Sequence, residues 1–321
     1  IPVVTIYGAA FLIGLIGNTL VIFAMLGDRK SRSVTASFMV SLAIADLLYL
    51  MVCVPFETSR YFIGHWEIGP FLCKLSGYVE MLSALASVLN LTAVSIERYT
   101  VIVHPILSRA WCTLGNTKKI LPGVWLIALL LSSPTFHVMV ERNVFYKNET
   151  SVIMIYCADI GIEKPDRLVF AIYQFLVMFV APTIILFFCY VFVIHSLWII
   201  PENPSISRHF HIRSRRSLVN KATREHSVEV LRARKQVLNL KTTYPWRCGQ
   251  NFIKQVIKML ITIIIVFLAC WGPKLMFRVL QRMNVNIFHQ SIVLECLPYI
   301  QSCLNPIIYG FMSRNFRKSM Q

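Results

Sequence analysis

Residues 73–105 read CKLSGYVEMLSALASVLNLTAVSIERYTVIVHP, and this stretch decides the fold of the chain. Cys73, Glu80 and Arg98 belong to a series at alternating steps of four and three, which places them on one face of a helix. At about 1.5 Å per residue, Cys73 and Arg98 are roughly 37 Å apart, enough to cross a hydrocarbon layer of about 30 Å. The stretch therefore predicts one membrane-spanning helix with a thiol at one surface, an arginine at the other and a carboxylate about 10 Å inside.

The composition places the whole chain among integral membrane proteins. Of its 321 residues, 56% are hydrophobic and only 15% are charged, which is too apolar for a soluble globular protein. The net charge of +17 gathers in the segments between apolar runs, so it indicates membrane topology and not a nucleic-acid partner. The nine cysteines form no CxxC metal pair, and most lie inside apolar runs.

Seven apolar segments predict an all-α membrane protein, a seven-transmembrane helix bundle that forms one domain over residues 1–321. The segments cover residues 2–26, 36–60, 71–103, 119–140, 168–199, 253–281 and 288–311. Basic residues follow the first, third and fifth segments, which puts those loops in the cytoplasm and the N-terminus outside. We expect a basic third cytoplasmic loop at about 200–252, a second extracellular loop at about 141–167 and a short amphipathic eighth helix at about 313–320. The chain starts at Ile1 within an apolar run and stops at Gln321, so we expect tails beyond both ends.

Several short sequence motifs follow one another along these segments. They are Asp46 within the second segment, Glu97-Arg98-Tyr99 at the end of the third, Pro182 and Tyr190 in the fifth, F-x-x-C-W-x-P at 267–273 and N-P-x-x-Y at 305–309. Together they resemble the rhodopsin-like (class A) G protein-coupled receptors across essentially the whole chain. The resemblance implies a plasma-membrane receptor that is not an enzyme, with a heterotrimeric G protein and arrestin as partners.

The resemblance also assigns roles to individual residues. It implies a disulfide between Cys73 and Cys157, and activation and G-protein coupling through Glu97, Arg98, Tyr99, Tyr190, Phe267, Trp271, Pro273, Asn305, Pro306 and Tyr309. An acidic residue common at the base of the sixth helix is Ile253 here, so raised basal activity is a hypothesis. The sequence Asn148-Glu149-Thr150 predicts N-glycosylation at Asn148 because the predicted topology places it outside.

Asp46 lies near the middle of the predicted membrane, where a carboxylate needs partners. One reading is a buried acid satisfied through water by neighbours that include Asn18. The other is an allosteric sodium ion, because hard cations prefer oxygen ligands. The oxygens would come from Asp46, Ser87, Ser302 and Asn305. No other metal or cofactor is expected.

Charged and polar residues point inward at the outer half of the bundle. The predicted ligand-binding residues are Glu57, Arg60, Glu80, Met81, Gln174, Lys274, Arg278, Glu295 and Tyr299. A plainer reading is that Glu80 pairs with Lys274, and Glu295 with Arg278, without any ligand. So many charges in one cavity are costly unless a polar ligand uses them, and a wide charged cleft suits a peptide better than a small monoamine.

Short stretches such as 95–99 and 254–260 look most like thyrotropin-releasing hormone receptors, with ghrelin and cholecystokinin receptors close behind. The pocket departs from the first group at Met81, Lys274 and Glu295, so ligand identity does not follow. We expect an extracellular neuropeptide ligand and a Gq-type output with calcium release. The alternatives are a class A receptor for a small polar or lipid ligand, and an orphan receptor with high basal activity.

Overall fold

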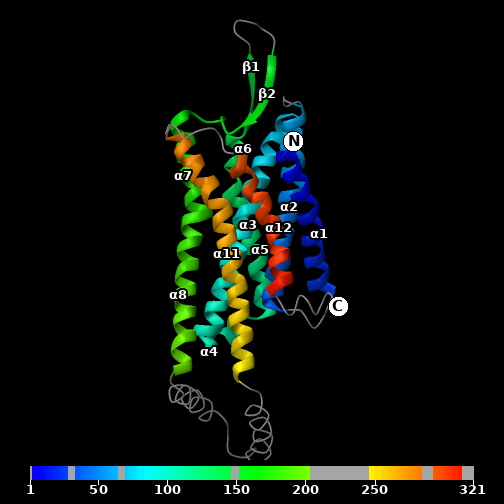
Figure 1. The fold of residues 1–321 in the computed structure, drawn as a ribbon. Helices are drawn as coiled ribbons and strands as arrows, with labels where there is room; N and C mark the ends of the chain where they lie inside the picture. The colour runs from blue at the N-terminus through cyan, green and yellow to red at the C-terminus, as the bar shows by residue number, and fades with distance from the viewer. Residues whose placement is uncertain are drawn as a thin grey trace, which may run out of the picture.

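A computed structural model of the chain describes residues 2–27, 33–63, 69–145, 152–202, 246–283 and 292–312. Long helices run side by side along one axis, as Figure 1 shows. The elements are α1 (Pro2–Gly27), α2 (Val34–Ile63), α3 (Pro70–Val103), α4 (Pro105–Trp111), α5 (Leu114–Ser132), α6 (Thr135–Val138), β1 (Val140–Phe145), β2 (Val152–Ala158), α7 (Lys164–Phe175), η2 (Leu176–Val180), α8 (Ala181–Glu202), α11 (Trp246–Arg282) and α12 (Ile292–Met312).

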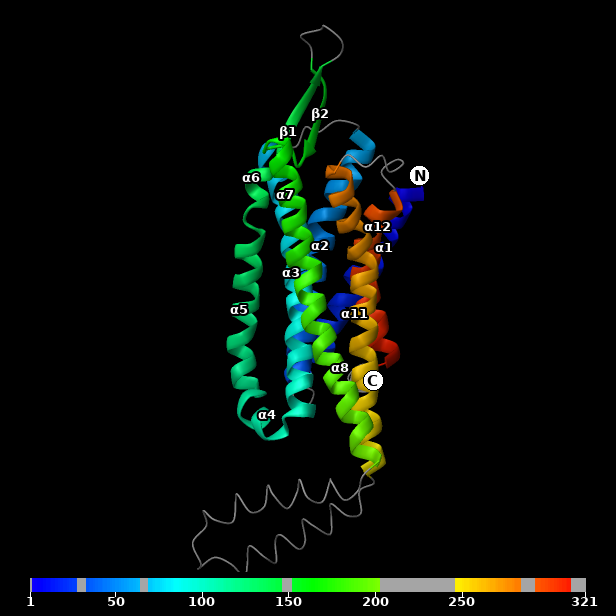
Figure 2. The ribbon, with the colours of Figure 1, turned by 90° about the vertical axis from the view of Figure 1, so that its left-hand side faces the viewer.

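Two features mark the opposite ends of the bundle. The antiparallel strands β1 and β2 project beyond one end, and the short helix α4 lies at the other (Figures 1 and 2). We call these the hairpin end and the α4 end. The start of α1 is at the hairpin end, and α12 runs from there toward the α4 end (Figure 1).

The helix predicted from residues 73–105 is the central one. In α3, 78% of the most apolar stretch is buried inside the protein, against 22% in α5. Small side chains such as Ala84, Ala86 and Ser87 are almost fully buried along it. Small residues let neighbouring helix backbones approach closely, as is typical of helix contacts in membranes. The middle of α3 is buried all round, and the predicted face includes the buried Ala84 and Ser87.

The outer surface of the bundle is apolar. Side chains such as Leu12, Phe23, Leu130 and Phe187 are more than half exposed. Six helices within the described ranges are long and apolar enough to cross a membrane, if α5 and α6 count as one helix and α7, η2 and α8 as another. α12 is the remaining long helix, and it carries the polar residues Glu295, Gln301 and Asn305. The predicted all-α membrane fold is confirmed, with the β-hairpin as an addition to it.

Helix bounds differ from the predicted ones in several places. α11 begins at Trp246, seven residues before its predicted start and inside the loop predicted at about 200–252. α5 begins at Leu114, five residues before the predicted start, because the Thr113 side chain accepts a hydrogen bond from the Asn116 N–H and caps the helix. The fifth long helix contains a wide π-turn, η2, immediately before Pro182. Proline lacks an N–H and cannot continue regular bonding, so a wide turn at this point follows from its chemistry.

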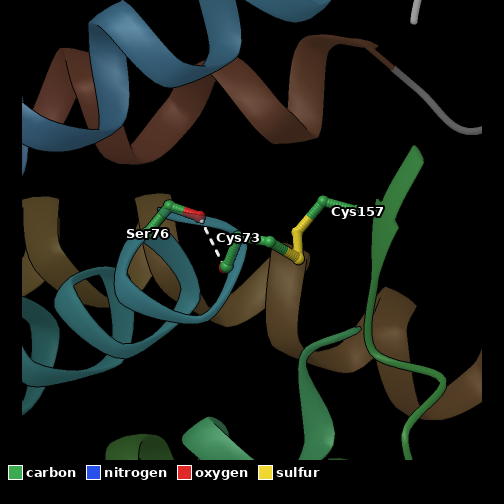
Figure 3. Close-up of a disulfide and its surroundings, with 3 residues drawn as sticks. All are labelled: Cys73, Ser76 and Cys157. Atoms are coloured by element: carbon green, nitrogen blue, oxygen red, sulfur yellow. Dashed lines mark hydrogen bonds between the residues drawn. A yellow bond between two sulfur atoms is a disulfide. The ribbon is translucent and has the colours of Figure 1, made fainter. Parts of the chain in front are cut away.

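The hairpin after α6 was not predicted and corrects the expectation of a plain loop. Val140 pairs with Ala158 and Glu141 with Cys157 in the ladder. The disulfide Cys73–Cys157 attaches β2 to the start of α3, as predicted (Figure 3). Both sulfurs are buried. The bond therefore holds the hairpin against the end of the central helix.

Some predictions fall outside the described residues. They concern the amphipathic helix at 313–320, most of the loop at 200–252, and the glycosylation site at Asn148. The side chains of Arg60 and Ile253 also lie outside them.

Candidate functional site

A cavity of about 380 Å³ lies at the hairpin end, between α2, α3, α7, α11, α12 and the end of β2. Eight of the nine predicted ligand-binding residues line it. These are Glu57, Glu80, Met81, Gln174, Lys274, Arg278, Glu295 and Tyr299. The ninth, Arg60, is the residue whose side chain the structure does not describe. The helical spacing from the motif residues thus predicted a set of residues that line one cavity from several helices.

Lys274 lies at the centre of the charges in this cavity. Its ammonium is 2.6 Å from Glu80 Oε1 and 3.0 Å from Glu295 Oε2. The Lys274 side chain is only 7% exposed, whereas the side chains of Glu80 and Glu295 are 25% and 40% exposed. A buried ammonium needs such partners, because desolvation without them is costly. One cation therefore joins α11 to both α3 and α12.

The plainer reading of the charges is correct for Glu80 and Lys274, and the structure adds an ion pair that this reading did not include. Glu80 pairs with Lys274 as predicted. Glu295 forms an ion pair with Lys274 at 3.0 Å. Arg278 donates to Gln174 Oε1 at 3.0 Å and lies 3.9 Å from Glu80. The reason for the added pair is the helical step: Lys274 is one turn deeper than Arg278, level with both carboxylates.

Sequence reasoning missed a second charged pair, Arg282 with Asp159. Asp159 follows β2 and lines both the main cavity and a smaller neighbouring one of about 150 Å³. Arg282 lines the smaller cavity together with Arg278. The four-residue step from Arg278 to Arg282 could have found the arginine. The position of Asp159 could not have been found, because it depends on the unpredicted hairpin.

Aromatic side chains form the floor of the cavity. Tyr299 contacts Tyr7 and Tyr49, with ring centroids 4.7 Å and 4.8 Å apart. Trp271 lies beneath Lys274, whose ammonium is 5.8 Å from the tryptophan ring. Phe267 stacks on Trp271 one turn further along α11, with centroids 6.2 Å apart. A continuous contact therefore runs from the cavity charges into the buried core.

Polar groups gather below these rings, in the middle of the bundle. Asn305 Nδ2 donates to Asp46 Oδ2 at 2.7 Å, and Asn18 Nδ2 donates to the Ser302 carbonyl at 2.9 Å. Asp46, Ser87, Ser302 and Asn305 are all nearly fully buried. Within the part of the chain that the structure describes, Asn18 Oδ1 and Asn305 Oδ1 have no hydrogen-bond partner. Oxygen atoms with unused lone pairs beside a carboxylate suit a small hard cation or water.

The Glu97-Arg98-Tyr99 motif lies at the α4 end of α3. Arg98 Nε is 2.6 Å from Glu97 Oε2, and its guanidinium also hydrogen-bonds Thr35 on α2. Tyr99 contacts His104 through its hydroxyl at 3.1 Å. Arg98 is thus held in place by its own neighbour, as predicted, and by Thr35, which the sequence did not reveal.

The remaining motif residues lie on the helices that surround α3. Ser95 on α3 donates to the Tyr190 hydroxyl of α8 at 3.4 Å. Pro273 lies inside α11, Pro306 lies inside α12, and Tyr309 is 1% exposed. The predicted activation residues therefore extend from the cavity floor to the α4 end.

The fold and site define a multi-pass membrane protein with a charged, ligand-sized cavity at one end and a paired arginine at the other. Comparison with known proteins then gives the family. Residues 17–309 match the family model described as 7 transmembrane receptor (rhodopsin family), and the chain belongs to that family. The predicted class is confirmed.

Curated relatives cover almost the whole chain at low identity. The somatostatin receptor type 4 of Rattus norvegicus is 29% identical over 98% of this chain and 71% of that receptor. The allatostatin-A receptor of Bombyx mori is 28% identical, over 97% and 76% respectively. The cholecystokinin receptor of Xenopus laevis is 24% identical, over 98% and 75%. These relatives are receptors, in agreement with the prediction that the chain is not an enzyme. The likeness to thyrotropin-releasing hormone receptors stays a prediction.

Proposed function

We propose that this chain is a plasma-membrane receptor for an extracellular neuropeptide and that it activates a heterotrimeric G protein. The hairpin end faces outside and the α4 end faces the cytoplasm, in line with the basic loops of the sequence. The observation that carries the proposal is the cavity at the hairpin end, whose walls bear four carboxylates and two cations. The similar proteins named as receptors for somatostatin, allatostatin-A and cholecystokinin support a peptide ligand.

A peptide matches the polarity of this cavity. Gln174, Glu80 and Arg278 offer amide, carboxylate and guanidinium groups, which suit backbone amides and charged side chains of a ligand. Met81 accepts weak hydrogen bonds from Thr135 and Gln174, so this side of the cavity is softer and fits an apolar side chain. A small polar ligand is the second candidate, because about 380 Å³ is also the size of a small-molecule site.

The proposed signal follows the contacts described above. A ligand in the cavity changes the position of Lys274 and Trp271, and the bend at Pro273 lets the remainder of α11 swing. Release of Arg98 from Glu97 then exposes a cationic surface at the α4 end. We propose Gq coupling with calcium release as the output, and arrestin as a further partner. Raised basal signalling, suggested by Ile253, belongs to the same proposal.

We also propose that a sodium ion modulates the receptor. Asp46, Ser87, Ser302 and Asn305 would hold it, and the free oxygen of Asn305 fits that role. The ion would neutralise the Asp46 carboxylate, whose burial is otherwise costly. These residues keep α2, α3 and α12 in one arrangement, and a change of that arrangement would expel the ion.

Calcium release in cells expressing the receptor tests the proposal. Cells are challenged with a neuropeptide panel, with and without a Gq inhibitor, and size-fractionated extracts test for non-peptide ligands. We expect a peptide-specific, inhibitor-sensitive signal that Glu80→Gln weakens at least about tenfold, because the charged contact is lost. Lys164→Met is the matched control, since Lys164 is exposed at the start of α7. Silence at confirmed surface expression would contradict Gq coupling, and activity confined to small-molecule fractions would contradict the peptide ligand.

A further inference from the structure

The charges around the cavity are sorted by helix. The cations are on α11, where Lys274, Arg278 and Arg282 follow one another at steps of four and so share one helical face. The carboxylates come from the other walls, namely Glu57 of α2, Glu80 of α3, Glu295 of α12 and Asp159 after β2. At the hairpin end, α11 is therefore a basic helix set against acidic neighbours.

Each cation on this face contacts a different part of the surrounding wall. Lys274 joins α3 and α12 through Glu80 and Glu295, at 2.6 Å and 3.0 Å. Arg278 contacts Gln174 of α7 at 3.0 Å, with Glu80 at 3.9 Å. Arg282 pairs with Asp159 beside the disulfide-anchored hairpin. The three contacts join this half of α11 to α3, α12, α7 and the segment after β2.

Of the three, Lys274 is placed to control the bend of α11. It directly follows Pro273, where the helix lacks a backbone hydrogen bond, and it lies over the ring of Trp271. It is also the most buried of the three cations, so its two ion pairs are the least screened by water. Ion pairs made by the residue next to Pro273 limit how far α11 can bend at this proline.

We propose that Lys274 acts as an internal restraint that holds the receptor inactive and that the agonist releases it with a positively charged group of its own. The inference rests on the proposed receptor function. The agonist's ammonium or guanidinium would take over Glu80 and Glu295, which are reachable because both side chains are partly exposed to the cavity. Lys274 then no longer joins α11 to α3 and α12, and α11 is free to move about Pro273. An anionic ligand group would have to separate α11 from carboxylates already bound to it. A positively charged ligand group is therefore favoured as the group that displaces Lys274.

The first experiment measures the movement of α11 directly and needs neither ligand nor G protein. An environment-sensitive fluorophore is placed at Lys258→Cys near the α4 end of α11, with Cys112 and Cys248 replaced by serine, in full-length receptor in nanodiscs. We expect Lys274→Met to shift the fluorescence toward the moved state, with an about tenfold larger moved-to-resting ratio, because breaking a buried pair removes a large share of the bias. Unchanged fluorescence would overturn the proposal.

Two further variants separate a tie from simple charge balance. In the variant Glu80→Gln, Lys274→Met, Glu295→Gln both carboxylates that pair with Lys274 are neutral as well, while Arg278 keeps its hydrogen bond to Gln174. α11 is then no longer joined to α3 and α12 through position 274. We expect this variant to show the same shift as Lys274→Met and to fold better. A return to wild-type fluorescence would mean that only the unpaired carboxylates mattered, and would overturn the restraint. Lys164→Met is again the matched control and should leave the fluorescence unchanged.

Signalling assays then test whether a positively charged group of the agonist releases Lys274. They also distinguish a failure of this inference from a failure of the proposed receptor function. Agonists from the neuropeptide panel are compared with analogues acetylated at the N-terminus and carrying citrulline for arginine and norleucine for lysine. We expect at least an about tenfold loss of potency in wild-type receptor and a smaller loss in Lys274→Met. An analogue that lacks the positive charges and keeps full potency would overturn the proposed role of the agonist's cation. If all variants are silent in cells while the fluorophore responds to Lys274→Met, the G-protein assignment fails and the restraint stands.

Discussion

A single added methyl group at Gly272 probes the packing between η2 and α11 beside the hinge. A Cβ at this position would lie 2.6 Å from Cε2 and 3.1 Å from Cζ of Phe179. Carbon atoms pack at about 3.5–4.0 Å, so the ring would have to move by roughly 1 Å. Phe179 stacks on Phe175, with centroids 5.4 Å apart, which resists that movement. The expected loss is about 1–3 kcal/mol, the usual cost of overpacking.

Thermal unfolding of the solubilised receptor, followed with a thiol-reactive dye, measures this cost. Gly272→Ala should lower the midpoint by about 2–4 °C for each kcal/mol lost. Gly77→Ala is the matched control. Its Cβ would approach Met139 Cγ equally closely, at 2.6 Å, but the unbranched methionine side chain adapts more easily than a stacked ring. Phe179→Leu should restore stability in the Gly272→Ala background and lower it alone. Equal midpoints for Gly272→Ala and wild type, or no rescue by Phe179→Leu, would refute this packing.

Three further changes test other parts of the structure. Cys157→Ser should reduce surface expression and the unfolding midpoint, because the disulfide closes a separation of 84 residues and contributes up to about 4.5 kcal/mol. Adding Cys73→Ser should cost little more stability. Additive losses would argue against the pairing. Sodium chloride, compared with N-methylglucamine chloride, should raise the midpoint saturably in wild type and not in Asp46→Asn, and an equal rise in both would exclude Asp46 from the site. Asn148→Gln should migrate on a gel like glycosidase-treated wild type, and a mobility shift produced by glycosidase in both proteins would place the glycan elsewhere.

The fold could be predicted because membrane spans leave a simple signal. Length, apolarity and the fixed order of Asp46, Arg98, Pro273 and Asn305 determine the helices and which faces point inward. The same spacing brought eight predicted residues to one cavity, since a helical step converts a known position into its neighbours.

What could not be predicted depends on contacts between distant segments. The hairpin of β1 and β2 depends on pairing across a loop, and with it comes the position of Asp159. The partner of Glu295 depends on how deep Lys274 lies relative to α12. The contact of Arg98 with Thr35 depends on the relative height of α2 and α3. None of these relations has a signal in the periodicity of a single helix.

The most direct test of the central claim is nucleotide exchange on a purified Gq heterotrimer by the full-length receptor in nanodiscs, with and without a peptide agonist from the panel. We predict that the peptide accelerates exchange, that Glu80→Gln shifts the half-maximal peptide concentration upward, and that Arg98→Ala abolishes the acceleration at unchanged peptide binding. Exchange that does not respond to a bound peptide, or an Arg98→Ala receptor that still accelerates it, would contradict the transfer of a signal from the cavity to the α4 end.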